Sequence, residues 1–316
     1  MAILLQNVLL ANYTTYKIGG PAKYFAEAKD EKDIVGALSE YNNLSPINKK
    51  IFILGGGANT LFSDEGYDGL VLKISMADIT INNDDIICVG AGTSLQDILS
   101  FSVERNLTGM EWAVGIPGSC GGAIRGNAGA FGREMKDCII SVKSVAIQNC
   151  EEIIERQNNE EMFGYRTSIF KSVLQNEIIL SGKIKLLPGN ATDIQAKIQN
   201  HIDYKKEKLP LEWPSAGSVF KNVDISKITQ EQLQKWKDVI KTDPFPVIPV
   251  ALLILEAGLK GKTIGGAMIS EKHSNFFINT GNAKASDVKS LIDFTKETIK
   301  EKFGIIIEEE IQIVSK

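Results

Sequence analysis

The sequence predicts a fold of mixed helices and strands in three consecutive units. Ile51–Leu54 is a short apolar run that ends in glycines, and Leu70–Ile74 is a second run. Asp30–Tyr41 has the period of an amphipathic helix, with Ile34, Val35 and Leu38 facing inward. The first unit is therefore a small assembly of alternating strands and helices that ends near residue 75. A length of 316 residues leaves room for two or three domains.

The second unit covers residues 76–211 and the third covers 212–304. The second contains a predicted strand, a helix and two further strands: Ile86–Val89, Leu95–Arg105, Ile139–Ile147 and Glu177–Leu187. The third contains two polar helices, a proline-containing extended segment between them and an apolar strand after them: Thr229–Ile240, Ser286–Lys302, Asp243–Pro249 and Ile305–Val314. We expect the last strand, within residues 305–316, to join the first unit.

The composition is that of an ordinary soluble globular protein with a slight acidic excess. A nucleic-acid or membrane-surface partner normally requires a basic face, so neither is expected. The amino terminus has too short an apolar run for a membrane span and lacks the basic start of a signal peptide. We therefore expect a cytoplasmic protein without membrane insertion. A monomer is also expected.

Cysteine and histidine are too few and too scattered to predict a metal centre. Cys88, Cys120, Cys138 and Cys150 form no C-x-x-C spacing, which disfavours a zinc site and a disulfide framework. The sequence has two histidines, so Ser-His-Asp chemistry and a histidine-based metal site are also disfavoured. We predict no metal and four reduced cysteines.

Gly115–Gly132, which reads GIPGSCGGAIRGNAGAFG, carries more glycines than a regular helix or strand tolerates. We interpret it as a buried, ligand-wrapping loop whose backbone amides bind an anion such as a pyrophosphate. A glycine-rich linker is the alternative, but a linker would be rich in Ser, Lys or Glu. Here the glycines alternate with apolar residues such as Ile116, Ala123 and Ile124.

Gly55–Thr60 follows a predicted strand and resembles a phosphate-binding turn, although a tight structural corner remains an alternative. It is not a Rossmann fingerprint, because Thr60 stands where the third glycine is required. Gly258–Thr263 likewise departs from a Walker A loop, because Glu256 occupies the first glycine position. The two glycine segments, Gly55–Thr60 and Gly115–Gly132, could together hold one dinucleotide without a Rossmann fold.

Three further segments combine polar groups with apolar surroundings. Phe163–Lys171 and Pro214–Asn222 each place a hydroxyl beside an aromatic residue and a cation. Each could equally be a strand edge with an exposed basic residue. Glu308, Glu309 and Glu310 interrupt the apolar terminal segment, as either functional carboxylates or the charges of an exposed edge strand.

In their order and spacing these motifs resemble the UDP-N-acetylenolpyruvoylglucosamine reductase (MurB) family. The resemblance runs from TYKIGGPA at Thr15–Ala22 through LGGGANTLFSD, GIPGSCGGAIRGNAGAFG, YRTSIFK, PSAGSVFKN and AGLKGKTIGGAMISEKHSNFFIN to the glutamate-bearing terminus. It covers nearly the whole chain. The short interval between YRTSIFK and PSAGSVFKN is similar to the type II branch.

The resemblance implies an α+β protein. An FAD-binding fold of the vanillyl-alcohol-oxidase (PCMH) type would form its first two units, and a C-terminal α+β domain would bind the UDP-sugar. The implied reaction reduces the enolpyruvyl ether of UDP-N-acetylglucosamine enolpyruvate to UDP-N-acetylmuramate, in peptidoglycan precursor synthesis. NADPH would reduce FAD, whose N5 would then deliver hydride to the substrate. FAD would be noncovalent, because no histidine precedes His201 and a histidyl link from either glycine segment is excluded.

The resemblance also implies the site residues. Arg166, Ser218 and Glu310 would be catalytic, as carboxylate-binding cation, proton donor and assisting carboxyl, with the register of Glu310 against Glu308 left open. FAD would contact Gly55, Gly56, Gly57, Ala58, Asn59, Thr60, Gly115, Ile116, Pro117, Gly118, Ser119, Gly121, Gly122, Asn127 and Gly129. The substrate would contact Phe131, Lys221, Asn222, Lys272 and His273, where His273 could instead be structural.

Three residues depart from the family pattern: Gln312 stands for an arginine, Val223 for a proline and Phe131 for a tyrosine. Two other functions remain open. A flavin oxidase or dehydrogenase could act on a small alcohol through the same FAD-binding fold. A flavin-binding protein without catalysis would have no use for Arg166, Ser218 and Glu310.

Overall fold

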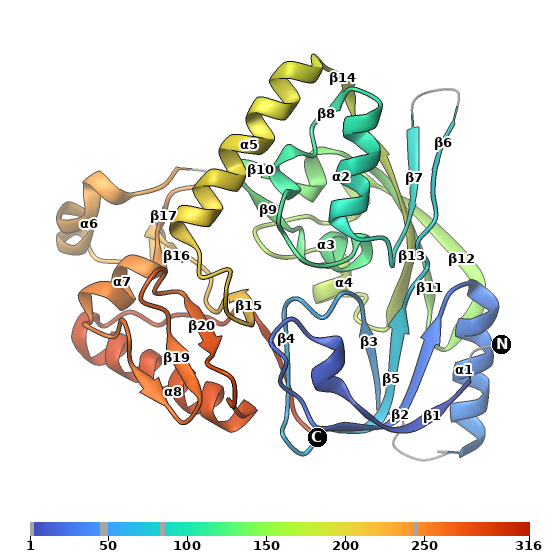
Figure 1. The fold of residues 1–316 in the computed structure, drawn as a ribbon, viewed down its shortest axis with the longest axis horizontal. Helices are drawn as coiled ribbons and strands as arrows, with labels where there is room; N and C mark the ends of the chain where they lie inside the picture. Colours follow the sequence, from blue (N-terminus) through green and yellow to red (C-terminus); the bar gives the residue numbers. More distant parts are fainter. Residues whose placement is uncertain (1–2, 45–49, 83–85, 243–244) are drawn as a thin grey trace. The chain divides into compact units, whose positions relative to one another are not determined.

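The computed structural model describes residues 3–44, 50–82, 86–242 and 245–316. The chain forms two compact units, each assembled from separate stretches of sequence (Figure 1). Unit 1 comprises Met1–Val8, Pro21–Gly57 and Tyr67–Lys205, and unit 2 comprises Leu9–Gly20, Ala58–Gly66 and Lys206–Lys316. The division into domains 1–75, 76–211 and 212–304 remains a prediction.

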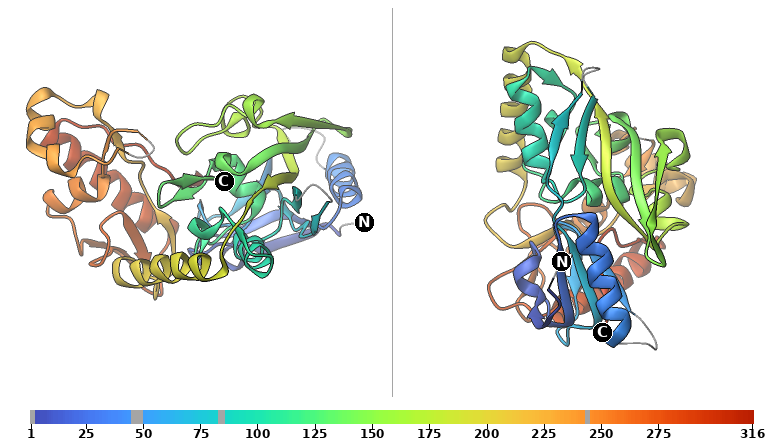
Figure 2. Two further views of the ribbon diagram at one scale, coloured as in Figure 1. Left: turned by 90° about the horizontal axis from the view of Figure 1, so that it is seen from above. Right: turned by 90° about the vertical axis from the view of Figure 1, so that its right-hand side faces the viewer.

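The first sheet of unit 1 has the strand order β1-β2-β5-β3. Its strands are β1 (Leu5–Leu9), β2 (Pro21–Ala28), β3 (Ile51–Leu54) and β5 (Tyr67–Ile74). Both β2 and β3 run parallel to β5. Helix α1 (Glu31–Leu44) packs against β2 (Figure 2) and buries Ile34 and Leu38. The predicted strands at 51–54 and 70–74 and the helix predicted over 30–41 are confirmed. The inward position predicted for Val35 is wrong, because its side chain is 41% exposed and the buried face of the helix is the one that carries Ile34 and Leu38.

The second sheet of unit 1 has the order β12-β11-β13-β7-β6 and is antiparallel. Its strands are β6 (Ile79–Ile81), β7 (Ile86–Gly90), β11 (Ile139–Ala146), β12 (Asn149–Gln157) and β13 (Glu177–Lys185). Helices α2 (Leu95–Glu104) and α5 (Ala191–Lys208) lie on the same side of this sheet (Figure 2). The predicted strands at 86–89, 139–147 and 177–187 and the helix at 95–105 are confirmed.

The glycine-rich segment is not the continuous loop that the sequence predicts. Its middle forms a short helix, α3 (Cys120–Gly126), which packs on β13. The Oγ of Ser119 caps the helix by accepting from the amide of Gly122, and Asn127 ends it with a left-handed φ of 43°. Glycine suits this helix because α3 packs closely against the segment that contains Ala91. A Cβ added to Gly121 would lie 2.9 Å from the Cβ of Ala91.

Unit 2 is built around a four-stranded antiparallel sheet of order β15-β20-β19-β18. Its strands are β15 (Ser215–Ser218), β18 (Thr263–Ile264), β19 (Ala267–Ile269) and β20 (Phe276–Asn279). Helix α8 (Ala285–Phe303) buries Val288, Leu291 and Ile292 in the core of the unit. The carboxylate of Asp64 accepts from the amides of Ala285 and Ser286 and so satisfies the start of α8.

The two helices predicted in the third unit are confirmed, since α6 (Gln230–Trp236) lies within 229–240 and α8 covers 286–302. Of the extended segment predicted over 243–249, the first two residues lie outside the described residues, and β17 (Val247–Ile248) falls within it. The predicted strand Ile305–Val314 is wrong over most of its length, because only β21 (Gln312–Val314) is a strand, paired in parallel with β4 (Thr60–Phe62).

The physical reason lies in the segment between α8 and β21. Ile305 and Ile307 are buried whereas Ile306 is 69% exposed, so the chain alternates as an extended strand would. Among the described residues, however, the backbone of this segment forms one isolated bridge, between Phe220 and Glu309, and neither residue belongs to a strand. The sequence therefore predicted the alternating burial of these side chains correctly and a continuous strand incorrectly.

The remaining elements are short. They are η1 (Leu10–Tyr13), β8 (Leu107–Thr108), η2 (Glu111–Ala113), β9 (Gly129–Ala130), β10 (Arg133–Glu134), η3 (Met135–Asp137), η4 (Asn158–Glu160), α4 (Ile169–Ser172), β14 (Leu187–Pro188), β16 (Val223–Asp224), η5 (Ile225–Lys227), η6 (Lys237–Val239) and α7 (Val250–Glu256). In the described part of the chain, no helix has the length and apolarity needed to cross a membrane. All four cysteines are free thiols.

Candidate active site

Two glycine segments meet inside unit 1 and form what we call the glycine cradle, Gly55–Gly57 against Gly118–Ser119. A Cβ added to Gly56 would lie 2.6 Å from the Cα of Gly118. A Cβ added to Gly55 would lie 2.5 Å from the Oγ of Ser119. Gly57 and Gly118 have φ values of +64° and +128°, which side chains rarely allow. The close approach of two backbones thus explains why these positions are glycine.

The cradle has the donor set that a phosphate group needs. Gly57 and Ser119 are both buried, and no acceptor for either backbone amide is found among the described residues. Buried amides almost always have a partner, so two such amides in one place fit an anionic ligand. Other amides of the predicted set are already used: that of Gly121 donates to Ala91 and that of Ile116 to Ala113.

Asn127 is fully buried and its side chain binds protein groups. Its Nδ2 donates to the carboxylate of Glu134 at 3.1 Å and to the carbonyl of Gly164 at 2.9 Å, and its Oδ1 accepts from the amide of Lys136. The side chain therefore ties the end of α3 to the loop that carries Arg166. Its contact with FAD remains a prediction.

Arg166 is held in a strained backbone conformation by several contacts within unit 1. Its φ is +55°, in the left-handed region that non-glycine residues seldom adopt. Its Nη2 donates to the carbonyl of Gly129 at 3.0 Å, and its Nη1 lies 3.9 Å from Oε1 of buried Glu134. Lys171 donates to the carbonyl of Arg166 at 3.0 Å. Such fixed guanidinium geometry suits recognition of a carboxylate.

Ser218 ends strand β15 of unit 2, beside the segment that carries the terminal glutamates. The preceding residue, Gly217, has a φ of +75°. The amide of Glu310 donates to the carbonyl of Val219 at 2.7 Å, and the amide of Lys221 donates to the carbonyl of Glu308 at 2.9 Å. We call residues 218–221 and 308–311 the C-terminal pairing. It brings the backbones of two predicted catalytic residues together, although 92 positions separate them in the chain.

The glutamates of this segment have different surroundings. Glu308 is exposed and pairs with Lys227 at 2.7 Å and with Lys221 at 3.4 Å. The hydrogen bond from Lys227, with the charge of both lysines, lowers the pKa of Glu308, so this carboxyl is a poor proton donor. Glu309 pairs with Lys296 at 2.8 Å. Glu310 is half-buried, and its carbonyl accepts from Nδ2 of Asn59 at 3.0 Å.

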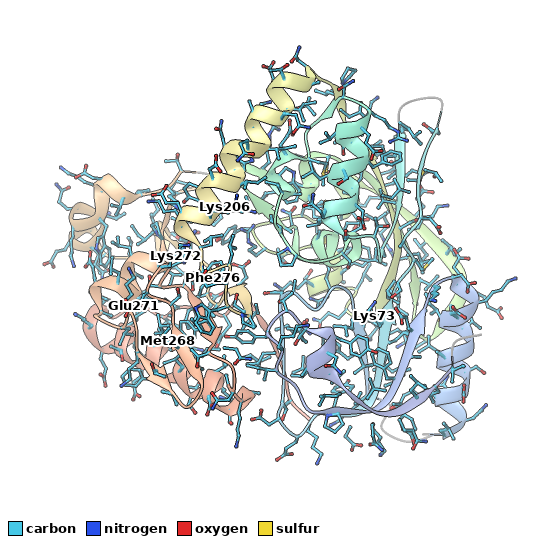
Figure 3. All side chains as sticks on the ribbon, in the orientation of Figure 1. Lys73, Lys206, Met268, Glu271, Lys272 and Phe276 are labelled. Atoms are coloured by element: carbon cyan, nitrogen blue, oxygen red, sulfur yellow. The ribbon has the colours of Figure 1, made fainter. Side chains whose placement is uncertain are left out.

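The residues predicted to bind substrate divide between the two units. In unit 2, Lys272 and His273 line a pocket of about 200 Å³ together with Lys260. Lys272 donates to the carbonyl of Lys206 at 2.6 Å, and Figure 3 labels both residues. Burial, with the charges of Lys241 and Lys260, lowers the pKa of His273. Asn222 accepts from the amide of Val250 through Oδ1.

Phe131 is the predicted substrate contact in unit 1, and its surroundings were not foreseen. Its ring stacks on that of His201, with centroids 3.8 Å apart and planes 3° apart. Tyr204 approaches the same ring edge-on at 5.5 Å. His201 and Tyr204 belong to α5, a helix that is hard to predict from the sequence because its residues are mostly polar. The four-residue spacing of Lys197, His201 and Lys205 is a signal that could have identified it.

The predicted site residues thus fall into two groups. Unit 1 contains Gly55, Gly56, Gly57, Gly115, Ile116, Pro117, Gly118, Ser119, Gly121, Gly122, Asn127, Gly129, Phe131 and Arg166. Unit 2 contains Ala58, Asn59, Thr60, Ser218, Lys221, Asn222, Lys272, His273 and Glu310. Among the described residues, no three His, Cys, Asp or Glu side chains are grouped so as to hold a metal ion.

Comparison with known proteins defines the class first. Residues 22–150 match the family described as FAD binding domain, and residues 209–314 match the family described as UDP-N-acetylenolpyruvoylglucosamine reductase, C-terminal domain. The chain is therefore an FAD-dependent oxidoreductase, and the predicted α+β class with its FAD-binding domain is confirmed.

Full-length relatives define the family. A UDP-N-acetylenolpyruvoylglucosamine reductase of Caldanaerobacter subterraneus subsp. tengcongensis is 39% identical, over 98% of this chain and 93% of its own length. That of Lachnoclostridium phytofermentans is 37% identical, over 98% and 92%. The crystal structure of the reductase (MurB) from Thermus caldophilus matches with a TM-score of 0.76 and 26% identity, over 99% of both chains. The chain belongs to the UDP-N-acetylenolpyruvoylglucosamine reductase family, as its motifs predicted.

Proposed function

We propose that this protein uses NADPH to reduce the enolpyruvyl ether of UDP-N-acetylglucosamine enolpyruvate to UDP-N-acetylmuramate, a step of peptidoglycan precursor synthesis. Family membership supports the reaction class. The observation that carries the catalytic assignment is the C-terminal pairing, in which the amide of Glu310 bonds the carbonyl of Val219, the residue after Ser218. The hydroxyl of Ser218, the carboxyl of Glu310 and the cationic Lys221 are thereby carried by two hydrogen-bonded backbone segments.

The residues of the glycine cradle fit FAD. Its backbones approach too closely to admit side chains, and the buried amides of Gly57 and Ser119 would meet the pyrophosphate. FAD, when bound, would accept hydride from NADPH and deliver it from N5 to the enolpyruvyl group. The protein itself would have to bind, orient and protonate the substrate.

Arg166 would bind the substrate carboxylate. Hydride addition to the terminal carbon leaves negative charge on the adjacent carbon, and this charge is delocalised into the carboxylate. A guanidinium already fixed by Gly129 and Glu134 stabilises that charge without reorganising during the reaction. Removing one such preorganised donor typically costs about 10²–10³ in rate.

Ser218 would donate the proton that completes the reduction, and Glu310 would assist by orienting the carboxylate or by supplying a proton. The surroundings of the glutamates favour Glu310 over Glu308 for this role, because two lysines already neutralise Glu308. Lys272 and His273, beside Lys260, form a basic pocket suited to the phosphates of the sugar nucleotide. Lys221, Asn222 and Phe131 would complete the substrate contacts.

The test is conversion of the substrate by the purified yellow protein. Incubation with NADPH and the enolpyruvyl sugar nucleotide should consume the two in equal amounts, and mass spectrometry should show a product with two more hydrogens than the substrate. If the flavin is instead reduced by a small alcohol and reoxidised by oxygen with release of peroxide, the protein is an oxidase and the proposal is wrong.

A further inference from the structure

Helix α5 of unit 1 passes beside β9, near the end of the glycine-rich segment (Figure 1). It carries a row of cationic and aromatic side chains that contact both ends of this segment. Lys197, His201 and Lys205 are spaced four residues apart, so they share one face of the helix. Each of these three residues contacts the polypeptide that leads into the glycine segment or the aromatic residue near its end.

At the start of the segment, Nζ of Lys205 donates to the carbonyl of Val114 at 2.5 Å. The next residue, Gly115, has a φ of +64°. One turn earlier on α5, Nδ1 of His201 lies 3.1 Å from the carbonyl of Glu111, which can only accept a hydrogen bond. Lys197 lies 3.8 Å from the carboxylate of Glu111. The entry to the segment is therefore fixed by α5.

Near the end of the segment, the same helix contacts Phe131. This residue has a φ of +53°, a conformation that a bulky side chain adopts only when its surroundings compensate for the strain. The parallel stacking of Phe131 on His201 is a contact of that kind. The ammonium of Lys205 also lies 5.6 Å from the centre of the Phe131 ring.

Using Lys205 for these contacts lowers the stability of the folded chain, because its ammonium group is buried. The residue is only 7% exposed, and within the described ranges no carboxylate lies at ion-pair distance from its ammonium. Burial lowers its pKa to about 8. The titratable groups of the surrounding row are Glu111, Lys197 and His201, and Glu111 is already bound to Thr108, Gly109 and Lys197. A buried charge without a counter-ion destabilises the folded chain.

We propose that His201 and Lys205, which we call the α5 clasp, are positioning residues that hold both ends of Gly115–Gly132 in the conformation that binds FAD. Neither residue has to touch the flavin. The inference depends on the proposed placement of FAD in the glycine cradle, and its test measures flavin binding rather than turnover.

The first test replaces Lys205 by methionine, which keeps an apolar stem of similar length and removes the ammonium. We expect the dissociation constant for FAD to rise about tenfold, measured by titration of flavin fluorescence on the full-length chain. The melting temperature of the flavin-free chain should stay the same or rise, because the variant removes the burial of a charge. The matched control is Lys206→Met at the exposed neighbour, which should change neither quantity.

The second test separates stacking from fold maintenance. His201→Phe keeps a flat ring against Phe131 and should retain most of the FAD affinity, whereas His201→Ala should lose about as much as Lys205→Met. The clasp is refuted if Lys205→Met binds FAD as the wild type does. It is also refuted if affinity and melting temperature fall together in both Lys205→Met and His201→Phe, since that pattern indicates a general packing role.

These outcomes are independent of the reductase assay. Loss of FAD affinity in the clasp variants would support the clasp even if the wild-type protein failed to reduce the enolpyruvyl substrate. Unchanged affinity would refute the clasp while leaving the proposed reaction intact.

Discussion

The glycine cradle and the C-terminal pairing reach their functions in opposite ways. In the cradle, backbones touch at Gly56 and Gly118, and the chemistry is that of bare amides. In the C-terminal pairing, the backbones of residues 219 and 310 are hydrogen-bonded, and the chemistry is expected from the side chains. We therefore expect the glycine cradle to lose its structure when a side chain is added to it. We expect the C-terminal pairing to keep its structure and to lose only catalytic activity when a side chain is changed.

The largest effect is expected in the cradle. Gly56→Ala would place a Cβ 2.6 Å from the Cα of Gly118, a distance that forces the backbone apart, so the purified variant should contain little or no FAD. The ratio of flavin to protein absorbance measures this. Gly126→Ala is the control, because a Cβ there has no heavy atom within 4 Å and the residue is helical. It should keep full flavin content and gain about 0.5–1 kcal/mol in stability. Equal flavin loss in both variants would contradict the cradle.

In the C-terminal pairing, Ser218→Ala should leave the fold and flavin reduction by NADPH unchanged. Reoxidation of the reduced flavin by substrate should slow by about 10²–10⁴, the usual contribution of a positioned proton donor. Stopped-flow absorbance follows the two half-reactions separately. If both rates match those of the wild type, Ser218 is not the proton donor.

A third expected effect concerns the stability of unit 1 around Glu161. Glu161 is fully buried, and neither of its carboxylate oxygens has a hydrogen-bond partner within the part of the chain that the structure describes. Burial raises its pKa to about 7 despite the opposing charge of Arg156. Because the folded pKa exceeds that of the unfolded chain, Glu161 should reduce stability progressively from about pH 4.5 to pH 7. The negative charges of Glu160 and Glu177 also raise the pKa of Glu161.

Glu161→Gln keeps the shape and cannot ionise. The difference in unfolding free energy between variant and wild type should grow in favour of the variant by on the order of 3 kcal/mol between pH 4.5 and 7, measured by urea unfolding. A difference that does not vary with pH would mean that Glu161 titrates normally.

The smallest effect separates the two candidate glutamates. Glu308→Gln removes exposed ion pairs with Lys227 and Lys221, so stability should fall by less than about 1 kcal/mol and turnover should stay near wild type. Glu310→Gln should slow the reoxidation of the flavin by substrate. The reverse result would assign the role to Glu308.

The same contrast explains what could be predicted from the sequence. Gly55–Gly57 and Gly118 were predictable because a close backbone approach admits only glycine, and short apolar segments marked strands such as β7 and β11. Lys205 was not predictable, since its value lies in a contact with Val114, 91 positions away, on a helix with few apolar residues. Glu161 stands in a run of polar residues, and only tertiary packing separates it from the exposed Glu160 beside it.

The proposed reaction requires a flavin that is reduced by NADPH and reoxidised by the enolpyruvyl sugar nucleotide, and an anaerobic titration of the yellow protein tests this requirement most directly. Added NADPH should bleach the flavin absorbance, and the sugar nucleotide should then restore it in equal amount without oxygen. A flavin that NADPH does not bleach, or that the sugar nucleotide leaves reduced, would contradict the account.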